Sequence, residues 1–217
     1  MKLRLVLFDL DGTLLNTLDD LGAAVNDALK RRNFPLHTRE EYMKMVGHGV
    51  RNLVIRALPA HLQEDAALVD DTLADFKTYY TAHIDAYTQP YPGMQEVVGA
   101  LHRNGVFLAV ASNKFQEGTE SLVKKFFPDI PFVAVLGNRP GFPLKPDPEI
   151  VGEVLRKAGV SRQEAVLVGD SPTDMKTAAN GGIEGIAVSW GYRPMKGVPG
   201  LTVVDSAEEL LTILTGK

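Results

Sequence analysis

Apolar residues follow two different patterns along the chain. Short and almost uninterrupted apolar runs, such as Leu3–Leu7 with Arg4 as its one polar residue, are typical of strands buried on both faces of a sheet. Longer segments repeat apolar residues every three or four positions, which is typical of amphipathic helices. The first pattern predicts strands at Leu3–Leu7, Val106–Ala111, Phe132–Leu136, Ala165–Val168, Gly185–Ser189 and Thr202–Val204.

The two patterns alternate from residue 89 to the end of the chain. Helical spacing separates or follows the expected strands at Met94–Arg103, Gln116–Phe127, Pro148–Ala158, Thr173–Asn180 and Ala207–Leu214. Such alternation predicts a parallel sheet with right-handed crossovers and helices on both faces. The sequence therefore predicts an α/β fold with a Rossmann-like core, in which residues 202–204 add a short edge strand.

Only helical spacing occurs between residues 16 and 88. It predicts helices at Leu18–Arg32, Thr38–Met45, Arg51–Leu58 and Gln63–His83. Thr38 and Glu41 form a capping-box pattern, and Asn16 or Thr17 is placed to cap the first helix. The prolines of segment 87–93 cannot continue a helix and mark the return linker. We therefore expect a discontinuous core of residues 1–15 and 89–217, with residues 16–88 inserted as a helical cap domain.

Composition and charge narrow the possible functions. The 217 residues carry a net charge of −4, which argues against a general nucleic-acid or anionic-membrane surface. No apolar stretch is long enough to span a bilayer, and the absence of cysteine excludes disulfides, thiolate metal sites and cysteine nucleophiles. The chain starts without a signal-peptide pattern. We expect a cytoplasmic monomer or homodimer that binds neither nucleic acid nor membrane.

The first expected strand ends in two carboxylates, Asp9 and Asp11, followed by Gly12 and Thr13. Residues two apart in an extended chain point to the same side, and ligands of open α/β sheets bind at the carboxyl ends of the strands. Two such close anions raise each other's pKa unless a cation lies between them. A plain turn formed by aspartate and glycine is the alternative interpretation.

Three other segments offer matching chemistry, each with a structural alternative. The Ser112 hydroxyl and the amides that follow it, beginning with Asn113, form a candidate anion site, although such residues also cap helices. Lys145 lies between stiffening prolines and could neutralise a phosphate, although most lysines are simply solvated. Asp170 and Asp174 form a second carboxylate pair at a strand end and, with Asp9 and Asp11, suit Mg²⁺; Asp174 could instead stabilise a helix dipole.

The stretch Asp9-Leu10-Asp11-Gly12-Thr13-Leu14 resembles the first motif of the haloacid dehalogenase-like phosphohydrolases. Ser112, Lys145 and the segment 168–174 resemble the second, third and fourth motifs, and phosphoglycolate phosphatases are the most similar branch. The resemblance implies that Asp9 is a nucleophile that forms an aspartyl-phosphate and Asp11 is a general acid and base. It implies a phosphoryl site at Ser112, Asn113 and Lys145. Mg²⁺ would be held by Asp9, the Asp11 carbonyl, Asp170 and Asp174.

The expected cap would select the substrate. The segment 47–52 combines two glycines with His48, Arg51 and Asn52, and it is similar to the specificity loop of phosphoglycolate phosphatases, which makes His48, Gly49 and Arg51 candidate substrate contacts. A simple break between two helices is the equally weighted alternative. Gly191-Tyr192-Arg193 could flank the same cleft, but the sequence assigns it no role.

The favoured function is therefore Mg²⁺-dependent hydrolysis of a small phosphate ester, with phosphoglycolate as first choice. A dehalogenase would lack the second aspartate and the metal site, and a phosphonate hydrolase would replace that aspartate, so Asp11 argues against both. A β-phosphoglucomutase-like mutase, a pyrophosphatase or another sugar-phosphate phosphatase would share the same core residues and stays open. A phosphate-binding module without activity would not need the complete set of acidic and basic residues.

Overall fold

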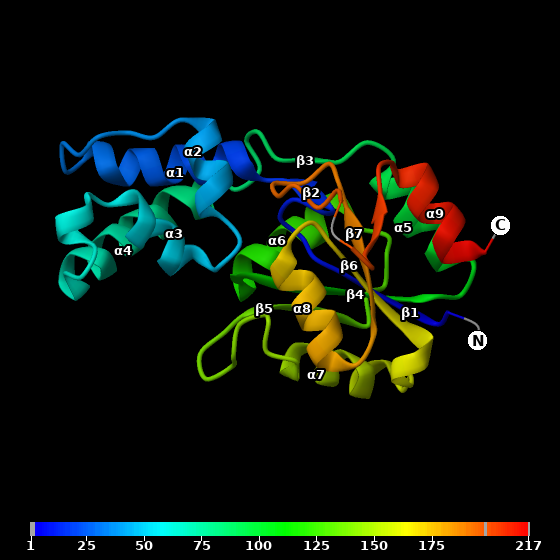
Figure 1. The fold of residues 1–217 in the computed structure, drawn as a ribbon. Coiled ribbons are helices and arrows are strands. Elements are labelled where there is room, and N and C mark those ends of the chain that lie inside the picture. Colours follow the sequence, from blue (N-terminus) through cyan, green and yellow to red (C-terminus); the bar gives the residue numbers. More distant parts are fainter. Residues whose placement is uncertain (1–2, 198, 217) are drawn as a thin grey trace.

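The computed structural model describes residues 3–197 and 199–216 and has a parallel six-stranded sheet at its centre (Figure 1). The strand order is β5-β4-β1-β6-β7-β8, and every pair of neighbours is parallel. The strands are β1 (Leu5–Phe8), β4 (Phe107–Phe115), β5 (Ala134–Asn138), β6 (Ala165–Gly169), β7 (Glu184–Val188) and β8 (Thr202–Val204). This confirms the predicted α/β fold, with β8 at one edge.

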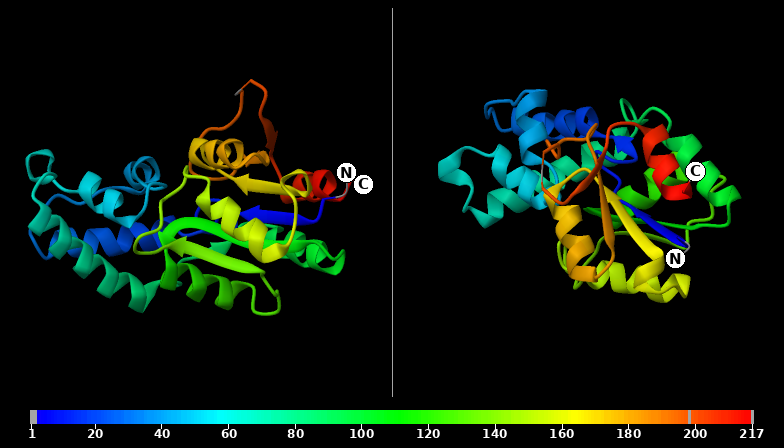
Figure 2. Two further views of the ribbon diagram at one scale, coloured as in Figure 1. Left: turned by 90° about the horizontal axis from the view of Figure 1, so that it is seen from below. Right: turned by 45° about the vertical axis from the view of Figure 1, so that its right-hand side comes forward.

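Helices cover both faces of the sheet (Figure 2). One face packs against α5 (Met94–Arg103), α6 (Gln116–Phe126) and α9 (Ala207–Thr215), and the other against α7 (Glu149–Ala158) and α8 (Pro172–Gly181). Strand β1 is fully buried because its side chains alternate between two hydrophobic cores: Val6 and Phe8 enter one, and Leu5 and Leu7 enter the other. Burial on both faces explains why this strand is almost continuously apolar.

Four more helices lie together beyond one end of the sheet, at the left of Figure 1. They are α1 (Leu18–Lys30), α2 (Arg39–Met45), α3 (Val50–Ala57) and α4 (Ala66–His83). Tyr42, Phe76 and Tyr80 are fully buried where these helices pack. The predicted capping box starts α2: the Glu41 N–H donates to Thr38 Oγ1, and the Thr38 N–H donates to Glu41 Oε2 at 2.7 Å.

The chain leaves and re-enters the sheet layer through two adjacent segments. β2 (Leu15–Asn16) and β3 (Gln89–Pro90) pair antiparallel. Beside them the buried Asp20 carboxylate accepts hydrogen bonds from the N–H groups of Tyr87 and Thr88 and from the Thr88 hydroxyl at 2.7 to 3.1 Å. The expected domain limits at 15/16 and 88/89 coincide with this pair of strands. The division into two domains itself stays a prediction.

Local predictions were wrong at several places, among them the start of α4, which begins at Ala66 instead of Gln63. β4 continues four residues beyond Ala111 to Phe115, and β5 starts at Ala134 instead of Phe132. Thr17 precedes α1 but makes no side-chain capping bond, because its hydroxyl donates to Asp11 Oδ1 at 2.7 Å. Within the described residues, no helix combines the length and apolar character that crossing a bilayer requires.

Candidate active site

The order of the strands brings distant residues together. β1 lies between β4 and β6, and Phe8 is in register with both Val110 and Val168. Asp9 therefore leaves β1 within one residue of the level of Ser112 on β4 and of Asp170, which directly follows β6. All three side chains are buried. The parallel sheet thus places residues from three parts of the sequence at one edge, as expected for ligand sites in open α/β sheets.

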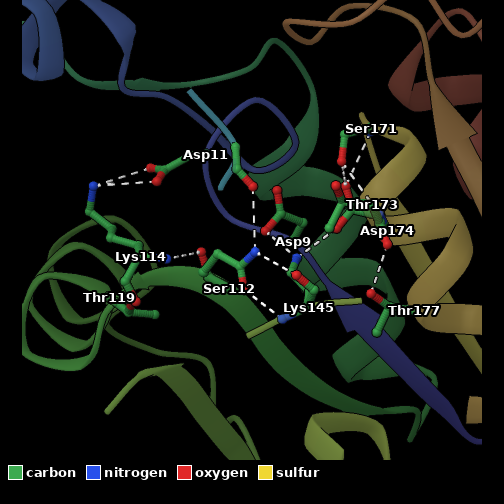
Figure 3. Close-up of polar contacts among 12 residues, drawn as sticks. Asp9, Asp11, Ser112, Lys114, Thr119, Lys145, Ser171, Thr173, Asp174 and Thr177 are labelled. Atoms are coloured by element: carbon green, nitrogen blue, oxygen red, sulfur yellow. Dashed lines mark hydrogen bonds and ion pairs between the residues drawn. The ribbon is translucent and has the colours of Figure 1, made fainter. Parts of the chain in front are cut away.

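Three carboxylates meet at this edge. Oxygen atoms of Asp9, Asp170 and Asp174 lie within 4.8 Å of one another, and these residues are 7%, 3% and 1% exposed. Asp174 Oδ2 accepts hydrogen bonds from the Ser171 hydroxyl at 2.5 Å and the Ser171 N–H at 3.1 Å. This capping box at the start of α8 fixes the carboxylate, so that Oδ1 faces the other acidic groups (Figure 3).

Lys145 reaches into this cluster from the segment before α7. Its Nζ lies 2.8 Å from Asp9 Oδ1 and 2.6 Å from Asp174 Oδ1 (Figure 3). The backbone of Lys145 is itself held by Asn113, whose Oδ1 accepts from the Lys145 N–H at 2.8 Å and whose Nδ2 donates to the Lys145 carbonyl at 3.1 Å. The structure therefore gives Asn113 a positioning contact, while its direct contact with phosphate stays a prediction.

Burial and like charge perturb the titration of the acidic groups. Burial raises the pKa of Asp9 well above its ordinary value, and the charges of Asp174 and Asp170 add to this against the opposing effect of Lys145. Burial, followed by the charge of Asp174, raises the pKa of Asp170 to about 7. Burial acts to lower the pKa of Lys145, but the two adjacent carboxylates outweigh it and raise that pKa.

The charge balance of the cluster fits a divalent cation. Lys145 is the only ammonium paired with the three carboxylates among the described residues, so two negative charges stay uncompensated when all are ionised. Buried charges are costly unless they are paired or coordinate a metal. Closely grouped carboxylate oxygens are hard ligands suited to Mg²⁺. The donors and the charge of this cluster therefore fit such an ion.

Asp11 lies beside this cluster and has a different set of contacts. Its carboxylate accepts from the Thr17 hydroxyl and lies 3.3 and 3.4 Å from Lys114 Nζ. Lys114 also donates to the Tyr80 hydroxyl at 2.6 Å, and its ammonium lies 4.4 Å from the centre of the Tyr80 ring. Tyr80 belongs to α4. Lys114 therefore joins a carboxylate of the sheet layer to one of the four outer helices.

Gly12 makes the close packing of the site possible. Its φ is +92°, and a Cβ built there would lie 2.5 Å from Asp170 Oδ2. An L-residue would therefore be strained in its backbone and would collide with the carboxylate cluster. The prediction that glycine permits a close backbone approach after Asp11 is consistent with this position.

One pocket joins the strand ends to the outer helices. Asp9, Asp11, Ser112, Lys145, Asp170 and Asp174 all line it from the sheet side. On the opposite side its lining residues are mainly apolar side chains and glycines: Leu21, Val46, Gly47, Gly49, Val50 and Leu53.

The structure brings Gly49 but not His48 or Arg51 into the pocket lining. His48 and Arg51 are exposed, and Arg51 forms an ion pair with Asp70 on α4. The reason is the start of α3 at Val50, since Val50 and Leu53 occupy the helix face that lines the pocket. For these two residues the expected position beside the substrate is not found.

Sequence reasoning missed several residues of the pocket. Lys114 lines it, and Tyr80 contacts it through Lys114. Tyr192 and Arg193, which the sequence offered as possible flanks of the cleft without a role, also line the pocket. The position of Lys114 directly after Ser112 and Asn113 was a usable signal, because all three occur at the end of one strand. Tyr80 gave no signal, since an aromatic residue at helical spacing is typical of a core position.

Comparisons with known proteins agree with this geometry. The sequence model described as haloacid dehalogenase-like hydrolase matches residues 6–188. A phosphoglycolate phosphatase of Mesorhizobium japonicum is 34% identical over 193 residues, which cover 88% of this chain and 85% of the relative. One of Rhodospirillum rubrum is 34% identical, with 95% and 89% covered. The crystal structure of a candidate phosphoglycolate phosphatase from Lactobacillus delbrueckii superposes with a TM-score of 0.91 at 33% identity and covers 100% of both chains.

Proposed function

The chain belongs to the haloacid dehalogenase-like hydrolase family, and we propose that it is a Mg²⁺-dependent phosphatase for a small phosphate monoester, with phosphoglycolate as the first candidate. The contact of Lys145 with both Asp9 and Asp174, beside Asp170, is the observation that supports this most directly. The choice of phosphoglycolate is supported by the names of the relatives, such as that of Mesorhizobium japonicum.

The carboxylates of Asp9 and Asp170, with the Asp11 main-chain carbonyl and Asp174 beside them, are the groups that would hold Mg²⁺. The bound ion would supply positive charge between an anionic carboxylate and an anionic phosphate ester. Asp9 and Asp170 are buried with pKa values above the ordinary one. Their ionised forms therefore depend on a nearby cation.

Asp9 is the nucleophile of the proposed reaction. One of its carboxylate oxygens forms a bond to phosphorus while the bond from phosphorus to the ester oxygen breaks, which gives an aspartyl-phosphate. Asp11 donates its proton to the leaving oxygen, so that an alcohol departs. Its carboxylate lies outside the carboxylate cluster, where it contacts Thr17 and Lys114, and it lines the same pocket as Asp9.

Water completes the reaction in the second step. Asp11, now ionised, accepts a proton from a water molecule as the water oxygen attacks phosphorus. The bond from phosphorus to Asp9 breaks, and inorganic phosphate and the free carboxylate are produced. The same residue thus donates a proton in one step and accepts one in the next.

Ser112 and Lys145 would stabilise the transferring group. Lys145 is buried and held in place through its backbone by Asn113, so its ammonium needs little reorganisation during the reaction. Fixed donors and charges of this kind lower the barrier of phosphoryl transfer mainly through position and electrostatics. Ser112 lies at the end of the neighbouring strand and lines the same pocket.

We further propose that residues 16–88 form a cap domain that covers the bound substrate. The helices of this region supply an apolar wall with two glycines, opposite the charged wall of the sheet. A small substrate would be enclosed between the two walls, and closure would exclude bulk water from the aspartyl-phosphate. The paired segments β2 and β3 are the place where such a unit would pivot.

The decisive experiment is a screen of small phosphate esters with the purified protein. We expect release of inorganic phosphate from phosphoglycolate in the presence of Mg²⁺, loss of activity with a chelator, and weaker turnover of an aryl phosphate. Isomerisation of glucose 1-phosphate, measured in parallel, separates a phosphatase from a mutase. Absence of Mg²⁺-dependent phosphate release from every ester tested would overturn the proposal.

A further inference from the structure

The segment 190–193 follows β7 and lies against the carboxylate cluster. A Cβ built on Gly191 would lie 2.2 Å from the Asp170 Cβ and 2.5 Å from the Gly12 carbonyl oxygen. Only glycine allows this approach, because such distances are far below van der Waals contact. Trp190 donates from Nε1 to the Thr13 carbonyl at 3.2 Å. This segment is therefore packed tightly against the residues that follow β1.

Tyr192 connects the cluster with the start of the outer helices. Its N–H donates to Asp170 Oδ2 at 2.6 Å, and its hydroxyl oxygen accepts from the Thr17 N–H at 2.8 Å. Thr17 is the residue immediately before α1. One residue, through its backbone N–H and its side-chain hydroxyl, thus links an acidic group of the proposed metal site to the point where the chain enters the region of residues 16–88.

Arg193 extends the same link to the end of α2. Its guanidinium donates to the carbonyl of Met43, to that of Lys44 at 3.0 Å and to that of Val46 at 2.7 Å. Carbonyls at a helix C-terminus lack intrahelical partners and carry partial negative charge, so a cation there satisfies and stabilises them. Arg193 comes from the sheet layer, whereas all three carbonyls belong to the outer helices.

The turn 46–49 is the part of the pocket that these contacts hold. Val46, Gly47 and Gly49 line the pocket, and the two glycines have φ values of +107° and +81°. Such backbone positions have wide conformational freedom in the unbound chain. From the sheet side, the turn is contacted at one end by Arg193 and at its centre by Asn113, whose Nδ2 lies 3.4 Å from the Gly47 carbonyl.

We propose that Arg193 is a positioning residue for substrate binding, which fixes the turn 46–49 over the phosphoryl site. This inference rests on the proposed function, since it names a determinant of substrate affinity in the same pocket. Arg193 has no hydrogen bond or ion pair with Asp9, Asp11 or Lys145 in the structure. Its loss should therefore weaken substrate binding more than it slows the chemical step.

Arg193→Met tests this inference, with Arg193→Lys as the conservative variant and Arg56→Met as a matched control. Arg56 lies on α3 and donates to the carbonyl of Met45, the residue just before the turn, at 3.2 Å, so it contacts the end of α2 without connecting it to the sheet layer. We expect Arg193→Met to raise KM for phosphoglycolate about tenfold while kcat changes less than about threefold. The KM of Arg193→Lys should lie between that of Arg193→Met and that of the wild type, and the KM of Arg56→Met should stay within about twofold of the wild type.

Two further measurements separate positioning from a general structural effect. Amide hydrogen exchange of residues 46–50 should be faster in Arg193→Met than in the wild type and Arg56→Met, while exchange in the sheet is unchanged. Affinity for Mg²⁺, measured by calorimetry, should stay within about threefold of the wild type. A parallel fall in Mg²⁺ affinity and kcat/KM would show instead that Arg193 acts through Asp170, and would overturn the inference.

An unchanged KM in Arg193→Met, or unchanged amide hydrogen exchange of residues 46–50, would also overturn the inference. If Arg193→Met does not fold, Arg193→Lys carries the test, because the loss of the planar guanidinium should still raise KM and the exchange rate. If the wild type hydrolyses no phosphate ester, the proposed function is wrong. The exchange measurement then still decides whether Arg193 holds the turn.

Discussion

The two walls of the pocket are built from different kinds of residues. The sheet supplies charged and polar side chains that are buried at strand ends, such as Asp9, Lys145 and Asp170. The region of residues 16–88 supplies apolar side chains and glycines, while its basic residue Arg51 lies exposed and outside the pocket lining. In the proposed function, the charged wall therefore acts on the phosphoryl group, whereas the apolar wall selects and encloses the part of the substrate attached to it.

Replacing the proposed nucleophile, Asp9, should have the largest effect on activity. Asp9→Asn keeps the size of the side chain but removes the carboxylate, so kcat should fall by at least about 10³-fold. The fold should persist, because the variant also removes one of three mutually repelling carboxylates. Phosphate release measures the first effect, and circular dichroism with thermal melting measures the second. Substantial activity in a folded Asp9→Asn protein would contradict the covalent route.

The next largest effect concerns Lys145, which contacts two carboxylates of the charged wall. Lys145→Met should lower kcat/KM by about 10²-fold or more, since the fixed charge next to the phosphoryl group is lost. In metal-free protein the free energy of unfolding should fall by about 3–5 kcal/mol, because breaking a buried ion pair leaves uncompensated charge. Urea denaturation in the presence of a chelator measures this free energy of unfolding. Lys125→Met, at an exposed ion pair, is the control and should change stability by less than about 1 kcal/mol.

Low pH should weaken Mg²⁺ binding by the acidic groups of the charged wall and leave the apolar wall unchanged. The pKa of Asp170 is raised to about 7 by burial and by Asp174, and metal binding requires the ionised form. Affinity for Mg²⁺ should therefore fall as the pH drops below about 7, which titration calorimetry at about pH 6 and about pH 8 can measure.

In the metal-free protein, the free energy of unfolding depends on pH in the opposite direction to Mg²⁺ affinity. The folded state keeps a proton on Asp170 up to about pH 7, whereas the unfolded chain releases it near pH 4. The folded state binds more protons in this interval, so the contribution of Asp170 to the free energy of unfolding decreases as the pH rises from about 4 to about 7. Asp170→Asn should remove that contribution. Equal Mg²⁺ affinity at about pH 6 and at about pH 8 would contradict the raised pKa of Asp170.

The variant with the smallest expected effect tests whether Arg51 contacts the substrate. Arg51 is exposed and paired with Asp70, so Arg51→Met should change KM for phosphoglycolate by less than about twofold. Steady-state kinetics of this variant beside Leu53→Ala, which alters a residue lining the pocket, provides the comparison. A large rise in KM for Arg51→Met would show that the sequence-based assignment of Arg51 to the substrate was right.

Much of the charged wall could be predicted because it follows from local sequence. Each of Asp9, Ser112 and Asp170 comes at the end of an apolar run, and parallel strands bring such ends to one edge. The bounds of α5 and of the capped helix α2 were predicted from periodicity and capping residues alone. The relevant signals lie within a few residues of the features they specify.

The remaining contacts depend on long-range packing that no local pattern encodes. Thr17 looks like an N-cap residue, but its hydroxyl contacts Asp11 and its N–H contacts Tyr192, which lies 175 residues away in sequence. His48 and Arg51 have suitable chemistry for an anion, but neither lines the pocket, since His48 precedes α3 and Arg51 lies on a face of α3 that is outside the lining. Residue type indicates what a side chain can do, whereas the tertiary fold decides where it points.

The pairing of β2 with β3 affects how this fold can vary between related proteins. Since Leu15 pairs with Pro90 and Asn16 with Gln89, the entire stretch between them begins and ends at nearly the same point in space. Insertions with adjacent ends leave the host domain undisturbed. We therefore expect that the proposed cap can be replaced as a whole, which would change the accepted substrates while the sheet and its strand ends keep their shape.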